Sequence, residues 1–277
     1  MYRLLLLLPF LLLACEEIPP VVTPAMPGDV VDETPVEDQL RQVLIEEFTG
    51  VRCLNCPAGS AALEDLLAIH GERLVAVSIH AGFFADPSSE IPLDLQTPAG
   101  DAILNLLGEP LGYPTAVINR TAYINGDLQT SAGDWAGIIA DELSNPPEVK
   151  IGLQTDYDEA TRALTVDADY RIAADFSGQA LQYTVLLTES NIIGPQDTPD
   201  GGVVDDYTHK HVLRDVLTNS AGELLGTDFT DGDRVEKSIT YTLPADWNAD
   251  NIEVITFVHR GGGEIGVVQA ARRKLRE

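Results

Sequence analysis

Positive charge is scarce in this chain. Of its 277 residues, 17 are Lys or Arg and 44 are Asp or Glu, which gives a formal net charge of −27 at pH 7. Nucleic acids and anionic lipid surfaces bind proteins through clustered lysines and arginines. The charge balance therefore disfavours both as partners, and we expect no nucleic-acid function.

The chain also has only three cysteines and no apolar run long enough to cross a membrane. The run Leu4–Ala14 contains 11 residues, whereas a membrane-spanning helix needs about 20 apolar residues. A basic Arg3 before this run and a small residue at its end are typical of a secretory leader. We therefore predict that residues 1–14 are a leader that is removed from the mature protein.

The cysteine after the leader has an explanation of its own. Leu12-Leu13-Ala14-Cys15 resembles the lipobox of bacterial lipoproteins, which implies cleavage before Cys15 and lipidation of its sulfur. Glu16 replaces the aspartate that retains familiar lipoproteins in the inner membrane, so the resemblance implies the outer membrane. Ordinary secretion with Cys15 left free is the alternative. Lipidation would account for the odd cysteine and leave Cys53 and Cys56 as a pair.

Residues 15–40 are predicted to be a tether. Within Glu16–Asp38 there are five prolines, seven acidic residues and no basic one. Such a segment buries too little apolar surface to fold, and its like charges favour extended conformations. We expect it to hold the folded part of the chain away from the membrane.

Residues 41–147 alternate strand-like and helix-like patterns, which predicts an α/β domain. A helix over Gly59–His70 separates two apolar strands, so these strands should pair in parallel through a right-handed crossover. The stretch Ala81–Pro98 is rich in Pro, Asp and Ser and is predicted to be irregular. The other predicted elements are the strands Val43–Phe48, Leu74–His80, Thr115–Asn119 and Ala122–Ile124 and the helices Ala99–Leu107 and Asp134–Leu143.

Two thiols lie where the first strand of this domain leads into the first helix. Cys53-Leu54-Asn55-Cys56 is a C-x-x-C motif, and a helix N-terminus stabilises a thiolate and lowers its pKa. A structural disulfide that closes so short a loop contributes only ~2 kcal/mol, so we favour disulfide exchange over a structural staple. Metal binding with His80 as third ligand is a further alternative. Because no fourth ligand is evident, we predict no metal site.

The order of elements resembles the thioredoxin fold, and three motifs carry the resemblance. That family begins the helix after a central strand with a C-x-x-C, keeps a carboxylate followed by Phe six residues before it, and places a cis-proline opposite the thiols. Glu47-Phe48 and Pro114 stand at the matching positions. The resemblance implies that Cys53, at the exposed end of the helix, attacks as the thiolate and that Cys56 resolves the mixed disulfide. It also implies that Glu47 accepts or returns the proton of Cys56, and that Pro114 presents backbone to the substrate and keeps metal away.

The chain departs from the thioredoxin pattern around these motifs. Val51-Arg52 replaces the aromatic and small residues that usually precede the first cysteine, and Arg52 would add positive potential beside Cys53. The Ala81–Pro98 stretch lengthens the gap between the dithiol and Pro114. The substrate preference of the family is therefore not implied, and the direction of the redox chemistry stays open.

From Glu148 onward, short strands follow one another without helices between them, which predicts an antiparallel β-sandwich over 148–277. The interruption Ser190–Asp233 is predicted to contain an acidic loop and a short helix near His211–Leu217. His209 and His211 could share one strand face and bind a metal, although a lone H-x-H is more often structural. The predicted strands are Val149–Thr155, Leu164–Ile172, Leu181–Thr188, Val235–Leu243, Ile252–Val258 and Ile265–Gln269, with Gly261-Gly262-Gly263 as a hairpin tip.

The whole pattern resembles the Omp28-related outer-membrane lipoproteins. The lipobox, the tether, the C-x-x-C unit and the string Tyr207-x-His209-x-His211-Val212-Leu213-Arg214 carry this resemblance. It implies a lipid-anchored protein of the bacterial outer membrane, facing either the periplasm or the outside.

The predicted function is thiol–disulfide exchange with the thiols or disulfides of other envelope proteins. No phosphate-cradling glycine loop, G-x-S-x-G or H-E-x-x-H is present, so no cofactor is expected. The alternative is a non-enzymatic surface binding or assembly lipoprotein in which Cys53 and Cys56 stay oxidised. The oligomeric state is left open by the sequence.

Overall fold

The computed structural model describes residues 36–276. The predicted leader, Cys15 and most of the predicted tether lie outside the described residues. The end of that tether belongs to the folded part, because Val36–Asp38 forms a 3-10 turn (η1) and the Gln39 side chain exchanges two hydrogen bonds with the backbone of Ile151. Residues 36–39, which the sequence analysis assigned to the tether, therefore contact the folded part.

A strand, a helix and a second strand open the fold as the sequence predicted. β1 (Val43–Thr49) and β2 (Leu74–His80) pair in parallel, and α1 (Cys56–His70) connects them. All residues of both strands are buried, as expected for parallel strands that are covered on both faces. α1 and α3 (Ala132–Leu143) pack on one face of these strands, and α2 (Pro98–Leu107) packs on the other.

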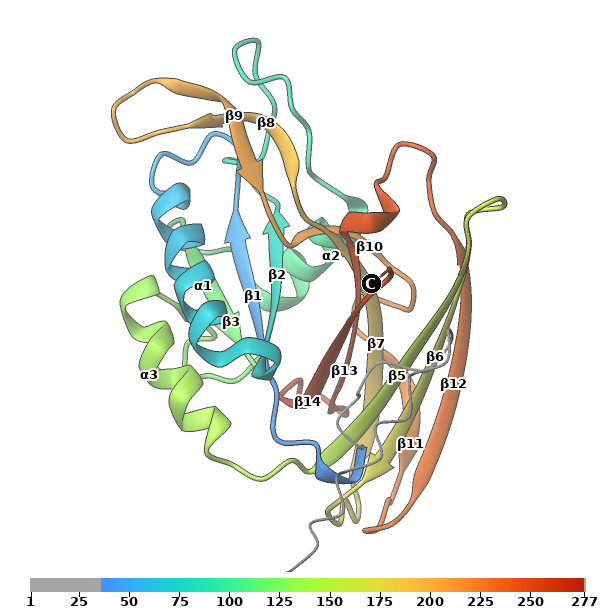
Figure 1. Cartoon of the computed structure of the whole chain (residues 1–277). Helices are drawn as coiled ribbons and strands as arrows, with labels where there is room; N and C mark the ends of the chain where they lie inside the picture. The colour runs from blue at the N-terminus through green and yellow to red at the C-terminus, as the bar shows by residue number, and fades with distance from the viewer. Residues whose placement is uncertain (1–35, 277) are drawn as a thin grey trace, which may run out of the picture. The chain divides into compact units, whose positions relative to one another are not determined.

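One nine-stranded mixed sheet runs through the described chain (Figure 1). Its order is β14-β13-β7-β10-β2-β1-β3-β4, with β11 paired to β7. The remaining strands of this sheet are β3 (Thr115–Ile118), β4 (Gln129–Thr130), β7 (Ala180–Glu189), β10 (Val212–Val216), β11 (Glu223–Thr227), β13 (Ile252–Arg260) and β14 (Val267–Lys274).

Two of the predicted elements are absent, and the strands β8 (Ile192–Asp197), β9 (Val203–His209) and β11 (Glu223–Thr227) were not predicted. The helix predicted near His211–Leu217 is wrong, because β10 occupies that segment and pairs with β2 and β7. The strand predicted at Ala122–Ile124 is also wrong. Ile124 forms only an isolated bridge to Asp127, and the neighbour of β3 is β4. For β10, pairing with distant strands outweighs the local pattern.

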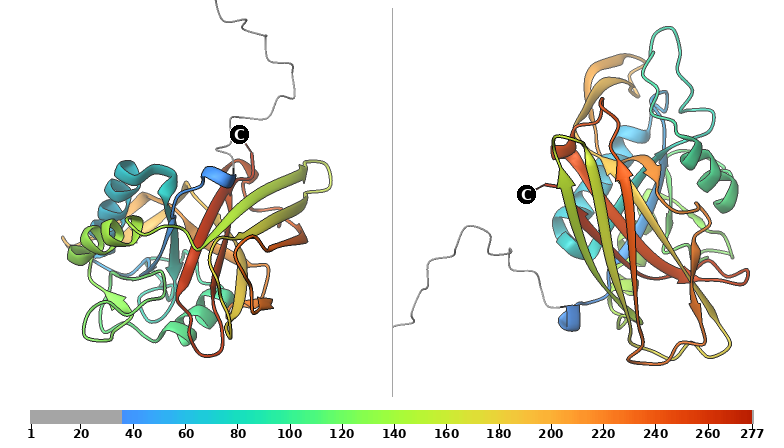
Figure 2. Two further views of the ribbon diagram at one scale, coloured as in Figure 1. Left: turned by 90° about the horizontal axis from the view of Figure 1, so that it is seen from below. Right: turned by 90° about the vertical axis from the view of Figure 1, so that its right-hand side faces the viewer.

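The second half of the chain is rich in β-structure and forms two facing layers (Figure 2). A three-stranded sheet, in the order β12-β6-β5, packs across an apolar core on β7, β13 and β14 of the large sheet. The strands of the smaller sheet are β5 (Val149–Asp158), β6 (Ala163–Ile172) and β12 (Arg234–Thr242), and a 3-10 turn, η3 (Ala249–Asn251), precedes β13. Gly261-Gly262-Gly263 lies between β13 and β14, at the predicted hairpin.

The described chain is therefore a mixed α/β fold with a β-rich region. The predicted boundary between residues 147 and 148 stays a prediction, but the described residues 36–276 belong to one compact unit. The large sheet takes strands from both sides of that boundary, and β10 joins β2 where the Ser78 N–H donates to His211 O over 2.7 Å.

A separate two-stranded hairpin formed by β8 (Ile192–Asp197) and β9 (Val203–His209) lies near the carboxyl ends of β1 and β2 (Figure 1). Within the described part of the chain, no helix is long and apolar enough to span a membrane.

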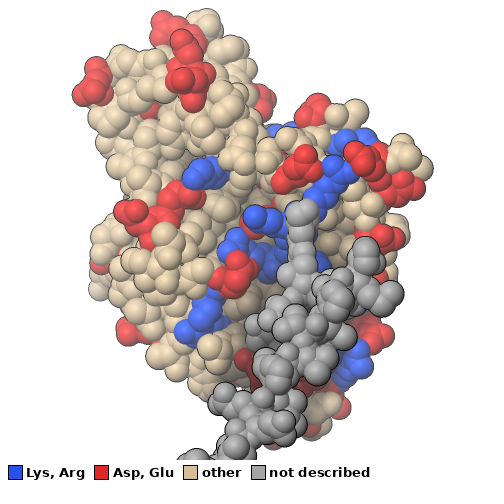
Figure 3. Space-filling view, in the orientation of Figure 1, with Lys and Arg blue, Asp and Glu red and all other residues tan. Residues whose placement is uncertain are grey.

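Acidic side chains are scattered over the face drawn in Figure 3, and basic ones lie among them near its middle. Many of the described arginines are engaged by carboxylates. Arg272, for example, forms ion pairs with both Glu72 and Glu253. Ion pairs of this kind place basic side chains directly beside acidic ones.

Candidate functional site

Cys53 and Cys56 form a disulfide. Cys56 is the first residue of α1, and Cys53 lies in the turn before it. The Cys53 N–H donates to Gly50 O over 3.0 Å and the Cys56 N–H donates to Cys53 O over 3.3 Å, which makes a tight turn between β1 and α1. Pro57 lies in the first turn of the helix, where a missing N–H leaves no hydrogen bond unmade. The helix therefore begins at the second cysteine, three residues before the sequence predicted.

Both cysteines are buried, with exposed fractions of 2% for Cys53 and 1% for Cys56. The prediction of an exposed Cys53 is wrong, because the β8–β9 hairpin covers the disulfide. The Gln196 side chain of β8 donates to Cys53 O over 3.1 Å and to Gly50 O over 3.3 Å. The Asp197 N–H donates to Val51 O over 2.8 Å. The hairpin is thus hydrogen-bonded to the turn that carries the first cysteine.

The irregular segment 81–97 covers a second side of this turn. The Arg52 N–H donates to Phe84 O over 2.9 Å, and the Arg52 guanidinium lies 4.9 Å from the centroid of the Phe83 ring. Its Nη1 also donates to Asp86 O over 3.4 Å. Arg52 is therefore bound to the covering segment, and its predicted effect on the thiolate stays a prediction.

Glu47 lies on β1 with no exposed surface. Its carboxylate accepts hydrogen bonds from the Ser78 hydroxyl at 3.0 Å and the Ser60 hydroxyl at 3.4 Å. Burial raises the pKa of Glu47 to about 7, although the two hydroxyls oppose this shift and the charge of Glu64 adds to it. A carboxyl with this pKa can take up or release a proton near neutral pH.

Pro114 contacts the same helix turn, next to Glu47. The Tyr113–Pro114 peptide bond is cis. A Cβ on Gly59 would lie 2.6 Å from Pro114 Cβ and 3.2 Å from Glu47 Oε1. Only glycine leaves room for this approach, so Gly59 allows the start of β3 and the buried carboxyl to pack against α1 together.

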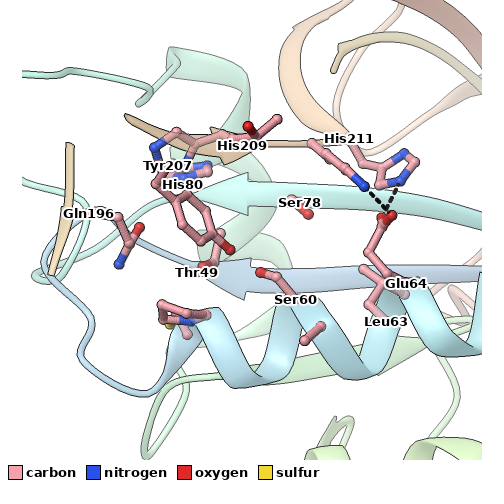
Figure 4. Close-up of a pocket in the computed structure, with 15 residues that line it drawn as sticks. Thr49, Ser60, Leu63, Glu64, Ser78, His80, Gln196, Tyr207, His209 and His211 are labelled. Carbon is pink, nitrogen blue, oxygen red and sulfur yellow. Dashed lines mark hydrogen bonds and ion pairs between the residues drawn. The ribbon is translucent and has the colours of Figure 1, made fainter. Parts of the chain in front are cut away.

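A pocket of about 280 Å³ opens between α1, the ends of β1 and β2, and β9 (Figure 4). Cys56 lines it and Cys53 does not. Carbon atoms make up the larger part of its surface, and polar groups are supplied by Ser60, Ser78, His80, Gln196, Tyr207 and His209. The pocket therefore connects one cysteine of the disulfide with the hydroxyls that bind Glu47.

Two buried histidines share a wall of this pocket. The His80 ring lies edge-on to the His209 ring at a centroid distance of 5.6 Å, and the Tyr207 ring lies 4.9 Å from that of His209. Burial lowers the pKa of His80 to about 3, helped by His209, and lowers that of His209 to about 4. Both rings are therefore neutral at pH 7. Among the described residues, His80 Nδ1 and His209 Nε2 have no hydrogen-bond partner.

The idea that His209 and His211 share a strand face is wrong. β9 ends at His209, and His211 has a positive φ of 53° in the turn before β10. His211 Nε2 instead lies 3.0 Å from Glu64 on α1, and Lys210 Nζ lies 2.5 Å from the same carboxylate. Within residues 36–276, no group of three or more His, Cys, Asp or Glu side chains is arranged to hold a metal ion.

The contacts of Glu64 fasten the chain after β9 to α1. The hydrogen bond from His211 is the largest cause that lowers the pKa of Glu64, which falls to about 2 with further help from Lys210. Glu64 is therefore ionised at neutral pH and holds one end of the hairpin in place.

Sequence reasoning found Cys53, Cys56, Glu47 and Pro114, and the structure brings the last three around the first turns of α1. It missed Gln196, which covers the turn, and the pocket residues contributed by β9. A signal for the hairpin was present, because the apolar pairs Ile192-Ile193 and Val203-Val204 flank an Asp200-Gly201 turn sequence. Such a pattern is typical of two paired strands.

The fold and the site define a mixed α/β protein with a covered C-x-x-C disulfide at the start of a helix. The chain belongs to the Omp28 family, since the model for "Outer membrane protein Omp28" matches residues 109–277, more than half of the sequence. The protein is therefore placed in the cell envelope at the outer membrane. The matched segment begins after the disulfide, so family membership by itself does not describe the cysteine site.

Solved structures with TM-scores above 0.5 share the fold. HBP35 of Porphyromonas gingivalis has a TM-score of 0.67 and 20% sequence identity, over 85% of this chain and 75% of its own. Protein AGR_C_4864 from Agrobacterium tumefaciens has a TM-score of 0.52 and 14% identity, over 86% and 96%. A domain of the outer membrane lipoprotein Omp28 from P. gingivalis matches 47% of this chain and 89% of its own at 18% identity, with a TM-score of only 0.32. No curated protein matches the sequence.

Proposed function

We propose that this protein is a lipid-anchored thiol–disulfide exchange protein of the cell envelope, with Cys53 and Cys56 as its redox pair. The β1-α1-β2 unit, the following antiparallel β3 and the packing of α3 support a thioredoxin-like fold for the first part. The facing β layers support a β-sandwich in the second part, which would dock a partner. Lipidation of Cys15, outside the described residues, would supply the anchor.

The observation that carries this proposal is the state of Glu47. A purely structural disulfide needs no ionisable group beneath it, and burial of an unpaired carboxyl is unfavourable. Glu47 nevertheless has no exposed surface, lies against the turn of α1 that follows Cys56, and has its pKa raised to about 7. Strongly shifted groups of this kind are concentrated at functional sites.

The chemistry follows from these positions. When the disulfide exchanges with an external thiol, one sulfur becomes bonded to that thiol and the other leaves as a thiolate, which needs a proton. Glu47 would deliver and later recover this proton near neutral pH. Pro114, packed on Gly59, would present backbone to the substrate and keep metal ions away from the thiols.

Two measurements test this function. In glutathione buffers, the Cys53–Cys56 disulfide should have a reduction potential above about −300 mV. Structural disulfides typically have potentials below this value. In whole cells, Cys56→Ser and Cys53→Ser variants should each be tested for mixed disulfides with other envelope proteins. A potential below that limit together with no trapped partner would leave the alternative, a scaffold whose disulfide stays oxidised.

A further inference from the structure

The covered disulfide restricts which thiols can reach it. Cys53 does not line the pocket, and the Gln196 side chain is hydrogen-bonded to the turn that carries Cys53. An apolar cluster beneath the same cover includes Val51, Ile91 and Leu95, with Ile192 and Val203 of the hairpin packed against it. A folded protein cannot place a surface cysteine on Cys53 while the hairpin stays in this position.

The pocket gives the second cysteine a different environment. Cys56 lines it together with Ser60 and Glu64, which follow at four-residue intervals on the same face of α1. At about 280 Å³ the pocket is slightly smaller than the range of about 300 to 1,000 Å³ that is usual for drug-sized ligands. A molecule that enters it beside Cys56 must therefore be small.

Among the residues that line the pocket, Ser60, Ser78 and two buried histidines supply the groups that suit a hydrophilic molecule. His80 Nδ1 and His209 Nε2 are buried, belong to residues that are 4% and 3% exposed, and have no partner among the described residues. Buried polar atoms in native proteins are nearly always hydrogen-bonded. A ligand with a polar group next to its reactive atom fits the unpaired histidines and the Ser60 and Ser78 hydroxyls of this lining better than an apolar ligand.

We propose that the substrate of this site is a small hydrophilic thiol, or the corresponding disulfide, which enters the pocket and reacts at Cys56 rather than at Cys53. This inference rests on the proposed exchange function and reverses the order of attack that the sequence implies. In the oxidised protein, the thiolate of the small molecule bonds to Cys56 Sγ. The Cys53–Cys56 bond breaks, and its electron pair leaves on Cys53 Sγ, which takes up a proton.

A second molecule of the same thiol completes the reaction. Its thiolate attacks the sulfur of the bound small molecule, so that a small symmetrical disulfide leaves and Cys56 remains as a thiolate. Two small thiols are thereby oxidised, and the protein disulfide is reduced by two electrons. The reverse sequence reduces a small disulfide at the expense of the protein dithiol.

The test compares two single-cysteine variants of the full chain, Cys53→Ser and Cys56→Ser, each with Cys15→Ser so that no third thiol reacts. Both lack the disulfide, so they form a matched pair. The probe is cystamine, a small hydrophilic disulfide, and mass spectrometry follows the gain of one cysteamine group. Because exchange rates depend on access, Cys53→Ser, which retains Cys56, should react at least about tenfold faster than Cys56→Ser.

A second pair of variants tests the route through the pocket. Ala61 and Ala68 are both exposed on α1, but only Ala61 lines the pocket. In the Cys53→Ser background, Ala61→Trp should slow the reaction at least about tenfold, whereas Ala68→Trp should leave it within about a factor of two. Circular dichroism confirms that both variants are folded.

The outcomes separate this inference from the proposed function. Faster reaction of Cys56→Ser, or equal rates for Ala61→Trp and Ala68→Trp, would overturn the inference that the small molecule reacts at Cys56 through the pocket. The reduction potential would still decide whether the wild-type pair is redox-active. A potential typical of a structural bond would remove the exchange function itself, whichever single cysteine reacts with cystamine.

Discussion

Adjacent glutamates on the two faces of β1 have different partners: one is paired with an arginine, and the other is not. Glu46 and Glu47 are both fully buried. Glu46 accepts two hydrogen bonds from the Arg120 guanidinium, at 2.9 and 2.7 Å, and Arg120 also lies 4.8 Å from the centroid of the Phe257 ring. Glu47 has two hydroxyl donors, Ser78 and Ser60, and forms no ion pair within the described residues.

This difference separates structural from functional burial of a carboxylate. The Glu46 carboxylate is paired with a guanidinium through two charge-assisted hydrogen bonds, and the arginine links β1 to the β-rich region through Phe257. The charge of Glu47 is not matched, so its pKa rises and its protonation becomes sensitive to pH near 7. Only the glutamate on the α1 face, beside the disulfide, is prepared for proton transfer.

The largest effect is expected from breaking the matched pair. Arg120→Met leaves Glu46 buried without a cation, which should destabilise the fold by about 3–5 kcal/mol in urea unfolding. Glu46→Leu combined with Arg120→Met should recover most of this loss, because no charge then remains buried. A loss below about 1 kcal/mol for the single variant would show that water reaches Glu46. The burial of Glu46 would then not differ in kind from that of Glu47.

The next effect concerns the unmatched glutamate. Folding raises the pKa of Glu47 from 4.5 to about 7, so the folded state binds the proton more tightly. The corresponding stability is fully present below pH 4.5 and is lost as pH rises through about 7, by at most about 3 kcal/mol.

Glu47→Gln has a neutral side chain that does not ionise, so its free energy of unfolding should not fall with pH in this way. Urea unfolding of the oxidised proteins at pH 4.5 and pH 8 measures it. The variant should gain stability relative to the wild type as pH rises, and a difference that does not change with pH would contradict the raised pKa.

A smaller effect is expected at the cover of the disulfide. Gln196→Ala removes the hydrogen bonds to Gly50 O and Cys53 O, and each such bond contributes about 1 kcal/mol. The stability should fall by about 1–2 kcal/mol, and hydrogen exchange should increase in β8 and β9. Gln154→Ala, on an exposed position of β5, is the control. Unchanged exchange in the hairpin would mean that Gln196 does not hold the cover.

The smallest effect is expected at Glu64, which is partly exposed. Its pKa is lowered from 4.5 to about 2, so its contribution is present above pH 4.5 and is lost as pH falls through 2. Solvent screening keeps that contribution below about 1 kcal/mol. Glu64→Gln should therefore be slightly less stable than the wild type at pH 7 and equal to it near pH 2. An equal stability at both pH values would show that the contacts with Lys210 and His211 contribute nothing.

The sequence predicts the parts of this site that depend on local patterns. The β1-α1-β2 unit is confirmed with boundaries close to those expected, because the apolar runs and the Pro57 helix start are encoded within each segment. Cys56 and Glu47 could be found in the same way, because Glu47 belongs to the strand and Cys56 to the helix start that these local patterns define.

The parts that were missed depend on contacts between distant segments. Arg120 lies 74 positions from Glu46, and Gln196 lies 143 positions from Cys53. The segment of β10 has no strong local preference, and it becomes a strand because β2 and β7 offer unpaired edges on both sides. The burial of Cys53 follows from that long-range packing, so no pattern around the C-x-x-C motif could have predicted it.

The reduction potential of the Cys53–Cys56 pair, measured from pH 5 to pH 9 in the wild type and in Glu47→Gln, tests the central claim most directly. If Glu47 exchanges its proton with the dithiol, the slope of the wild-type potential against pH should change near pH 7, and this change should be absent from Glu47→Gln. Two parallel curves without a break near pH 7 would contradict the account.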